Sequence, residues 1–280
     1  MKPKVIFSKK CLEYGSWHIE GPKRVERAYE ILKEKGYEFL TPEPAKEEDL
    51  LKVHDAAYIQ MLKDGHVEDA DTPAYENIYE YAKLSAGGAI LSAKVNGFSL
   101  MRPPGHHAGK NGTALGARTK GFCYINNIAV AVKYLDKPTL ILDIDGHHGN
   151  GTQEIFLNDE KAIYVSLHRY PHYPGTGYYS EANCLNFPLT ADCGEKIYLK
   201  TLEKALKQVD VEKIEVIAVS AGFDTHAGDL ASLGLTEKSY REIGKRIATL
   251  NKPTFFVLEG GYIGEMVGKD IDELLKGFQK

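Results

Sequence analysis

Seven of the ten histidines in the sequence fall in short segments that also carry aspartate, glutamate or tyrosine. They are His106, His107, His147, His148, His168, His172 and His226. Histidine and carboxylate side chains bind divalent metals and carry protons in many hydrolytic sites. Their grouping therefore indicates one polar site, because isolated core or surface histidines would be distributed along the chain.

Asp145 and His147 stand two residues apart just after a predicted strand. Alternate residues of an extended chain point to the same side, so these two side chains can face one point. A carboxylate and an imidazole suit a divalent metal such as zinc, and a catalytic zinc site uses three protein ligands. Asp224, at the end of another predicted strand, is the best third ligand. A single aspartate after a strand often only caps a helix, so the prediction depends on the three residues together.

The adjacent pair His106 and His107 offers two imidazoles that can exchange protons near neutral pH. An imidazole needs a partner on its second nitrogen to fix its tautomer, and Asp143 and Asn150 are the candidates. A charged partner raises the pKa of its histidine and a neutral partner leaves it lower, which would give the two different roles. Tyr262, on a Gly-Gly turn, offers a hydroxyl to a developing oxyanion. With a metal that polarises a carbonyl, these groups predict a hydrolytic reaction.

Two aromatic residues, Phe122 and Tyr173, lie next to or near glycines, Gly121 and Gly175. Glycine allows a backbone to approach closely, and aromatic rings make flat apolar walls. We expect a tube between the two rings, which suits an extended aliphatic chain. The alternative is that both are ordinary core aromatics.

The polar segments follow short apolar runs that are typical of strands buried on both faces. Strands are predicted at residues 5–7, 98–101, 139–142, 162–167, 216–220 and 255–258, and helices at residues 24–35, 75–95, 125–135, 196–209 and 237–250. This alternation predicts an α/β fold with a mostly parallel central sheet and helices on both faces. Open sheets of this kind bind ligands beyond the carboxyl ends of their strands. The first 75 residues are expected to form helices and loops on one edge.

The 280 residues are enough for two domains, but no linker or change in composition divides them. A boundary near the midpoint would separate Asp145 from Asp224. We therefore predict a single domain over residues 1–280.

Composition excludes several classes of protein. The chain is 43% hydrophobic and 26% charged, as in ordinary globular proteins. It has no long apolar run and no secretory signal, so we expect no membrane contact and a cytoplasmic location. Its four cysteines are widely spaced, which argues against a disulfide framework. The net charge of −4, with both signs interspersed, predicts no direct nucleic-acid binding. The oligomeric state is not predicted.

The motifs resemble those of the zinc-dependent histone deacetylase superfamily, which also includes acetylpolyamine amidohydrolases and acetoin-utilisation proteins. The matching blocks are HIEGPKR at residues 18–24, VH at 53–54 with Tyr58, DTP at 71–73, RPPGHHA at 102–108, GFCYINN at 121–127, DIDGHHGNGTQ at 143–153, SLHRYPHYPGTG at 166–177, SAGFD at 220–224 and EGGY at 259–262. At Asn150 and the run GNGTQ, the sequence resembles the class II and polyamine-hydrolase branch of this superfamily more than its other branches.

The resemblance implies the single-domain arginase/deacetylase fold and a role for each matching residue. Zinc would be held by Asp145, His147 and Asp224, and the catalytic residues would be His106, His107, Tyr262, Asp143 and Asn150. Substrate would contact Phe122, Tyr173, Asp71, Gly121, Gly260 and Arg24, with Arg24 near the acetate-release path. Potassium would be bound by Asp143, Asp145, His147, Ser166 and Leu167, and a second monovalent site would fall near Phe156, Asp159 and Ala162.

The activity that this resemblance implies is zinc-dependent removal of an N-acetyl or short N-acyl group from acetyl-lysine or an acetylated amine. One alternative is an amidohydrolase for an acetylpolyamine or another small metabolite. A second is an arginase-type ureohydrolase with two manganese ions, against which the missing carboxylates around His147 and Asp224 argue. A third is a non-catalytic binding protein, which the complete set of ligands and bases makes a poor fit. At position 173 this sequence has tyrosine, whereas phenylalanine is commoner in the superfamily. The added hydroxyl leaves the polarity of the tube between Phe122 and Tyr173 undetermined from the sequence.

Overall fold

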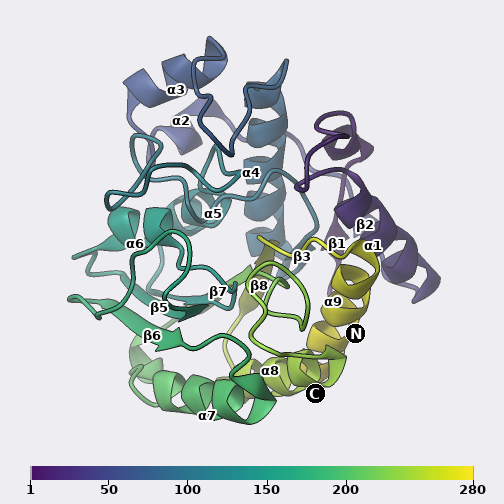
Figure 1. Ribbon diagram of the computed structural model, residues 1–280, viewed down its shortest axis with the longest axis vertical. Helices are drawn as coiled ribbons and strands as arrows, with labels where there is room; N and C mark the ends of the chain where they lie inside the picture. The colour runs from purple at the N-terminus through teal and green to yellow at the C-terminus, as the bar shows by residue number, and fades with distance from the viewer. Residues whose placement is uncertain (1, 280) are drawn as a thin grey trace.

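The computed structural model describes residues 2–279, and its centre is an eight-stranded sheet (Figure 1). The strand order is β2-β1-β3-β8-β7-β4-β5-β6, and every neighbouring pair is parallel. The strands are β1 (Val5–Ile6), β2 (Phe39–Leu40), β3 (Phe98–Ser99), β4 (Thr139–Asp143), β5 (Ala162–Arg169), β6 (Cys184–Leu189), β7 (Val216–Ala221) and β8 (Thr254–Leu258). The predicted α/β fold class is confirmed.

Helices cover both faces of this sheet, as predicted. One core lies between the sheet and α1 (Lys23–Glu34), α7 (Gly194–Leu206), α8 (Glu237–Thr249) and α9 (Gly264–Phe278). A second core lies on the other face, under α2 (Glu47–Leu50), α3 (Ala56–Lys63), α4 (Ile78–Val95), α5 (Asn127–Leu135) and α6 (Asn150–Phe156). Two short 3₁₀ helices complete the fold, η1 (Lys9–Leu12) and η2 (Val211–Lys213). Figure 1 shows the two groups of helices on opposite sides of the sheet.

The central strands form where the sequence is apolar and β-branched. β4, β7 and β8 are buried at every position, because helices cover both of their faces. Since all strands run the same way, their carboxyl ends lie along one edge of the sheet. The segments that begin at Arg102, Asp143, Ala221 and Glu259 are thereby brought together.

Two strands at the edges of the sheet were not predicted. β6 contains Asn186 and Pro188, and proline removes a ladder hydrogen bond, so its sequence lacks the apolar pattern of a central strand. An edge strand tolerates this because one side of it is unpaired. β2 has only two residues and lies at the opposite edge, beside β1. The first 75 residues otherwise form helices and loops, as expected, but these are not confined to one edge: α1 packs against α9 on one face, whereas α2 and α3 pack against α5 and α4 on the other.

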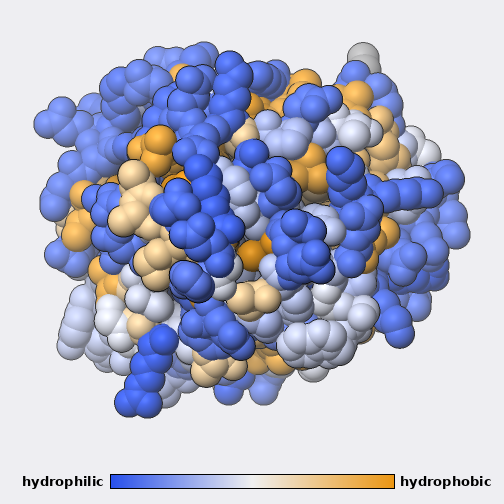
Figure 2. All heavy atoms as spheres, turned by 90° about the horizontal axis from the view of Figure 1, so that it is seen from above, coloured by the Kyte–Doolittle hydropathy of each residue, from blue (hydrophilic) through white to orange (hydrophobic). Residues whose placement is uncertain are grey.

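The surface is mixed in character. Figure 2 shows one face covered mostly by hydrophilic residues, with hydrophobic ones scattered between them. Within residues 2–279, no helix has both the length and the apolar character needed to cross a lipid bilayer.

Candidate active site

Three side chains from the ends of β4 and β7 converge at the centre of the site. Asp145, His147 and Asp224 each offer one ligand atom, and these three atoms lie within 4.8 Å of one another. The Nδ1 atom of His147 is 2.7 Å from Asp224 Oδ2 and 3.2 Å from Asp145 Oδ1. Both carboxylates are fully buried, and His147 is 9% exposed. The structure therefore brings together the three residues that the sequence singles out as metal ligands.

Backbone amides fix these two carboxylates in place. Gly260 N–H donates to Asp145 Oδ2 at 2.7 Å, and Gly146 N–H donates to Asp224 Oδ1 at 2.8 Å. Asp224 Oδ2 accepts no hydrogen bond from the described residues, so it faces His147 with its lone pairs available. Asp224 Oδ2 therefore has His147 Nδ1 as its neighbour, and Nδ1 in turn lies between Asp224 Oδ2 and Asp145 Oδ1, so the three candidate ligand atoms face one another.

The electrostatics of this group show that it needs positive charge. Burial and the neighbouring Asp145 carboxylate raise the pKa of Asp224 to about 6. Although burial opposes charge on His147, the carboxylates of Asp224 and Asp145 raise its pKa to about 10. Two carboxylates held this close in the protein interior repel each other unless a proton or a cation lies between them. The donor set, two carboxylates and one imidazole, is one that divalent zinc accepts.

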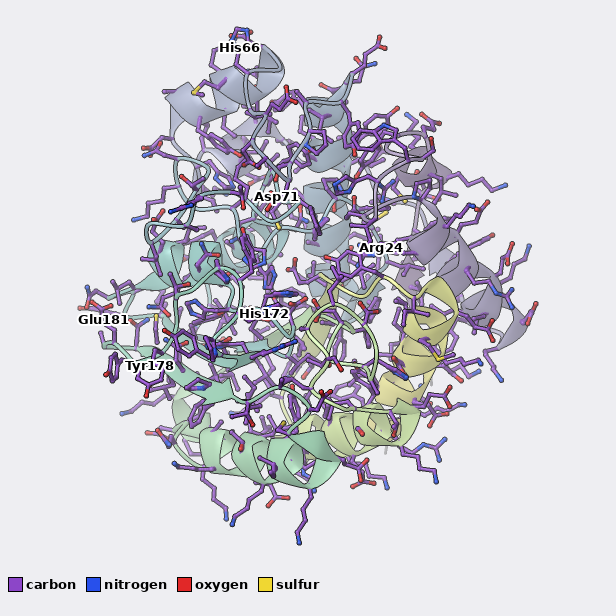
Figure 3. The ribbon with its side chains drawn as sticks, viewed as in Figure 1. Arg24, His66, Asp71, His172, Tyr178 and Glu181 are labelled. Carbon is purple, nitrogen blue, oxygen red and sulfur yellow. The ribbon has the colours of Figure 1, made fainter. Side chains whose placement is uncertain are left out.

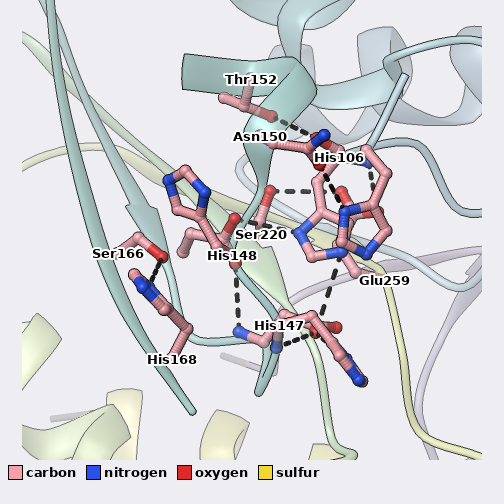
Figure 4. Close-up of polar contacts among 12 residues, drawn as sticks. His106, His147, His148, Asn150, Thr152, Ser166, His168, Ser220 and Glu259 are labelled. Carbon is pink, nitrogen blue, oxygen red and sulfur yellow. Dashed lines mark hydrogen bonds and ion pairs between the residues drawn. The ribbon is translucent and has the colours of Figure 1, made fainter. Parts of the chain in front are cut away.

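The two adjacent histidines each have the expected kind of partner, and Figure 4 labels one member of each pair, His106 and Asn150. His106 Nδ1 lies 3.0 Å from Asp143 Oδ2, and His107 Nδ1 lies 2.8 Å from Asn150 Oδ1. The amide of Asn150 donates through Nδ2 to the Ala114 carbonyl, so its oxygen faces His107. An oxygen acceptor at Nδ1 requires the proton on that nitrogen, which leaves Nε2 of a neutral His107 free to accept one.

The pKa values of these two histidines are shifted in opposite directions. Burial lowers the pKa of His106, but the carboxylates of Asp145 and Asp143 outweigh it and raise the pKa to about 10. The pKa of His107 lies well below its usual value, because it is buried and faces the charged His106 and His147. A charged and a neutral imidazole therefore stand side by side, with ring centroids 4.0 Å apart.

Glu259 also belongs to this site, although no role is predicted for it from the sequence. Its Oε2 accepts the backbone N–H groups of Gly105 and His106 at 2.8 and 3.1 Å, and Ser220 Oγ donates to its Oε1. Burial raises the pKa of Glu259 to about 7. Its place in the EGGY block, directly after β8, was the signal that could have found it.

Asp145, His147 and Asp224 form the candidate metal group. A cavity of about 200 Å³ opens at this group, because His147 is one of its lining residues. Its lining residues are Asp71, His107, Gly121, Phe122, His147, His172, Tyr173, Leu230 and Tyr262. Figure 3 shows Asp71 and His172 near the centre of the view, whereas His66 and Glu181 lie at the periphery. His172 and Leu230 were not among the predicted site residues. The ring of His172 stacks on that of His147 at 5.0 Å.

The two predicted wall residues line different sides of the cavity. The Tyr173 ring meets the His107 ring edge to face at 5.0 Å, and the Phe122 ring meets the Tyr262 ring at 5.8 Å. The hydroxyl of Tyr173 donates to the Thr119 carbonyl at 2.9 Å. Its polar group is therefore engaged by the chain itself, which leaves the ring to form an apolar wall.

Asp71 organises the loop that carries Gly121 and Phe122. Its Oδ1 accepts the Gly121 N–H and the Thr72 hydroxyl, and its Oδ2 accepts the Thr119 hydroxyl. Gly121 has a φ of 51°, and a Cβ there would lie 2.5 Å from the His107 ring. Phe122 also has a positive φ, 71°, which costs a non-glycine residue about 1–3 kcal/mol. The hydrogen bonds around Asp71 maintain this strained loop against the cavity.

The turn that carries Tyr262 is held from two sides. Arg24 Nε donates to the Gly261 carbonyl at 2.6 Å, and its guanidinium lies 5.0 Å from the centre of the Tyr262 ring. Asp229 Oδ2 accepts the backbone N–H groups of Tyr262 and Ile263 at 2.9 and 3.1 Å. Arg24 is buried beneath the turn, behind the Tyr262 ring, and does not itself line the cavity. Asp229 was not predicted, because nothing in its spacing distinguishes it from an ordinary loop aspartate.

The three remaining histidines of the cluster have structural partners, and His226 pairs through Nδ1 with Asp270 Oδ2 at 2.8 Å, outside the residues that line the cavity. His148 contacts Thr176 and Gln153, and His168 contacts Ser166 Oγ and the Gly177 carbonyl, all at 2.8 to 3.0 Å. Figure 4 shows His148, Ser166 and His168 to one side of His106 and His147.

Comparison with known proteins identifies the family. Residues 18–278 match the family described as Histone deacetylase domain. The chain belongs to the histone deacetylase family. A relative from Archaeoglobus fulgidus, named a probable deacetylase, is 37% identical over 295 residues, which cover 92% of this chain and 80% of that protein.

Two other family members show how widely the likeness extends. Acetylpolyamine amidohydrolase 1 of Pseudomonas aeruginosa is 30% identical over 322 residues, which cover 93% of this chain and 91% of that protein. Among solved structures, the HDA15 HD domain superposes with a TM-score of 0.88 at 28% identity, over 99% of this chain and 88% of that one. Membership of the histone deacetylase family supports a hydrolase that acts on amides, with a buried Asp-His-Asp group able to hold a metal.

Proposed function

We propose that this protein is a zinc-dependent deacetylase, which hydrolyses an N-acetyl or short N-acyl group from acetyl-lysine or an acetylated small amine. The observation that carries the proposal is the buried group of Asp145, His147 and Asp224, whose histidine lines a cavity of about 200 Å³, beside a charged and a neutral histidine. In the reaction the amide C–N bond breaks, water supplies hydroxide to the acyl carbon and a proton to the nitrogen, and acetate and a free amine leave.

The metal group fits zinc. Asp224 Oδ2 accepts no hydrogen bond from the described residues, His147 Nδ1 contacts only the two carboxylates of the same group, and the raised pKa of Asp224 reflects charge that a divalent ion would neutralise. When bound, zinc polarises an amide carbonyl and lowers the pKa of water. Asp145, His147 and Asp224 would hold it through one atom each.

The two histidines and Tyr262 supply the remaining chemistry. His107 lines the cavity with its Nε2 free, so it accepts the proton of the attacking water and then gives that proton to the departing nitrogen. His106, charged beside Asp143, stabilises the negative charge that develops during attack. The Tyr262 hydroxyl also lines the cavity and donates to the carbonyl oxygen as it becomes an oxyanion.

The cavity selects a linear acylated amine. Phe122 and Tyr173 give it apolar walls, which suit the methylene chain of acetyl-lysine or of an acetylated polyamine. Gly121 and Gly260 keep the space near His107 and the metal group free of side-chain atoms. Asp71, which lines the cavity, is the candidate contact for the substrate backbone. Arg24, buried behind the Tyr262 ring, is placed near the path by which acetate would leave. Relatives named for both deacetylation and acetylpolyamine hydrolysis support this substrate class.

A potassium ion beside the metal group is part of the proposal. The expected ligands are Asp143, Asp145, His147, Ser166 and Leu167. Asp143 on β4 is directly opposite Ser166 on β5 in the sheet register, so the two strand ends that would share the ion are adjacent. The proposed role of the ion is structural, since it would anchor the segment that carries Asp145 and His147.

The proposal is tested by measuring acetate release from an acetyl-lysine peptide and from an N-acetylated polyamine. His107→Ala and Tyr262→Phe should each lower kcat by about 10²-fold or more, because a general acid/base or an oxyanion donor contributes that much. Tyr179→Phe, a matched change at a side chain that is 78% exposed, should leave kcat unchanged. Activity of His107→Ala or Tyr262→Phe within twofold of wild type would mean that the roles are wrongly assigned.

A further inference from the structure

Three backbone carbonyl groups between α6 and β5 converge on one side chain. The carbonyl oxygens of Phe156, Asp159 and Ala162 accept hydrogen bonds from Asn183 Nδ2 at 2.8, 3.2 and 2.8 Å. Asn183 immediately precedes β6, so this one amide joins the end of α6, the start of β5 and the start of β6. The amide has two N–H groups for three acceptors, so at least one hydrogen bond is shared.

The orientation of this amide is fixed by its other end. Asn183 Oδ1 accepts the backbone N–H of Asn158 at 2.7 Å. Reversing the amide would place its NH₂ group against that N–H and turn its oxygen toward the three carbonyls. Both contacts would then be repulsive, so the nitrogen must face the carbonyls.

Converging carbonyl oxygens are also how proteins hold potassium. The resemblance noted above implies a second monovalent cation near Phe156, Asp159 and Ala162. In the structure, the positively polarised NH₂ group of Asn183 lies within hydrogen-bond distance of all three oxygens. These residues therefore do not fit a cation while Asn183 holds this position.

Positive charge is already present at the corner of the fold where α6, β5 and β6 meet at Asn183. The ammonium group of Lys133 pairs with Asp159 Oδ2 and lies 5.0 Å from the centre of the Phe156 ring. Lys161 N–H donates to Asp159 Oδ1 at 2.8 Å. The Asp159 carboxylate is thus compensated by the chain itself, and a second positive charge beside Lys133 would be disfavoured.

We propose that the Asn183 amide replaces the second monovalent cation, so that this corner of the fold is held without a bound ion. The corner matters for the active site because α6 carries Asn150, the partner of His107, and β5 carries Ser166 and Leu167. Asn183 is therefore a built-in positioning group for two elements that border the site.

The test compares wild type with Asn183→Ala by thermal unfolding in potassium chloride and in tetramethylammonium chloride at equal concentration. Removing the amide leaves three carbonyls and room for an ion, so potassium should stabilise Asn183→Ala more than wild type, by at least about 2 °C. The proposed first potassium site would be common to both proteins, so its contribution cancels in this comparison. Asn186→Ala is the matched control, because its amide donates to Gln153 and the Tyr179 carbonyl instead, and its potassium response should equal that of wild type.

Two results would overturn the proposal. Equal potassium responses would show that Asn183 does not stand in for a cation, and a smaller response in Asn183→Ala would show that Asn183 is itself a ligand. Should Asn183→Ala fail to fold, crystals of wild type soaked in rubidium chloride provide the second measurement. Anomalous scattering should place no rubidium among the Phe156, Asp159 and Ala162 carbonyls, and a peak there would contradict the substitution.

Discussion

Replacing Gly260 by alanine should disrupt the metal centre without disturbing the rest of the fold. A Cβ at this position would lie 2.6 Å from Asp145 Oδ2 and 2.6 Å from Asp224 Oδ2, whereas ordinary van der Waals contact begins at 3.4 Å. Each carboxylate would have to move by about 0.8 Å. The backbone cannot retreat instead, because Gly260 N–H donates to Asp145 Oδ2 at 2.7 Å.

A displacement of about 1 Å at a reacting centre costs about 10²-fold in rate. We therefore expect Gly260→Ala to lose about two orders of magnitude in kcat and to bind zinc more weakly. Zinc affinity is measured by competition with a chromophoric chelator, and folding by circular dichroism. Gly36→Ala is the control, because a Cβ at Gly36 meets no atom within 4 Å and Gly36 lies far from the site in sequence; its φ of 75°, unlike the backbone of Gly260, strains an alanine, yet zinc affinity and kcat should stay at the wild-type values. If Gly260→Ala kept the zinc affinity and kcat of wild type, a Cβ at this position would not displace the Asp145 and Asp224 carboxylates, and the prediction would be refuted.

Two further predictions concern pH and positioning. Burial lowers the pKa of His54 to about 4, so folding favours its neutral form, and stability that is complete above about pH 6.5 is lost as the pH falls toward 4. Linkage then predicts a loss of about 2 kcal/mol in the free energy of unfolding at pH 5. Urea unfolding should show this loss in wild type, and His54→Gln should lack it. Equal pH dependence of the two proteins would contradict this prediction. Asp229→Ala should lower kcat about tenfold or more at unchanged KM, because Tyr262 and Ile263 lose their acceptor, whereas Asp229→Asn should retain most activity. A rise in KM with unchanged kcat would show that Asp229 acts on substrate binding instead.

The central layer of the fold could be predicted from the sequence, because buried parallel strands are short apolar runs and β4, β7 and β8 have that pattern. The edge strands could not. β6 includes Asn186, whose side chain pairs with Gln153 and Tyr179, so its polar residue reflects a tertiary contact that no local pattern reveals.

The candidate site was predictable where chemistry and spacing coincide. Asp145, His147 and Asp224 follow strands and converge as expected, and the pairing of His106 with Asp143 is also found. Residues that act through the backbone were missed. Glu259 and Asp229 accept main-chain N–H groups, and such contacts depend on how loops distant in sequence meet.

The histidine at the cavity wall shows a different limit of prediction. His172 was noted as part of the histidine cluster but received no role, and only the fold places its ring against His147. Likewise, the resemblance implies a cation near Phe156, whereas the contacts of Asn183 emerge only when β6 is in place.

The most direct test of the central claim is a metal titration of the purified protein. Metal-free protein is mixed with increasing zinc, and acetate release from an acetyl-lysine peptide and from an N-acetylated polyamine is measured at each ratio. We predict no activity without metal, a linear rise up to one zinc per chain, and no further increase. Activity that is independent of metal, or that requires two manganese ions per chain, would contradict the assignment of Asp145, His147 and Asp224 as the ligands of a single catalytic zinc.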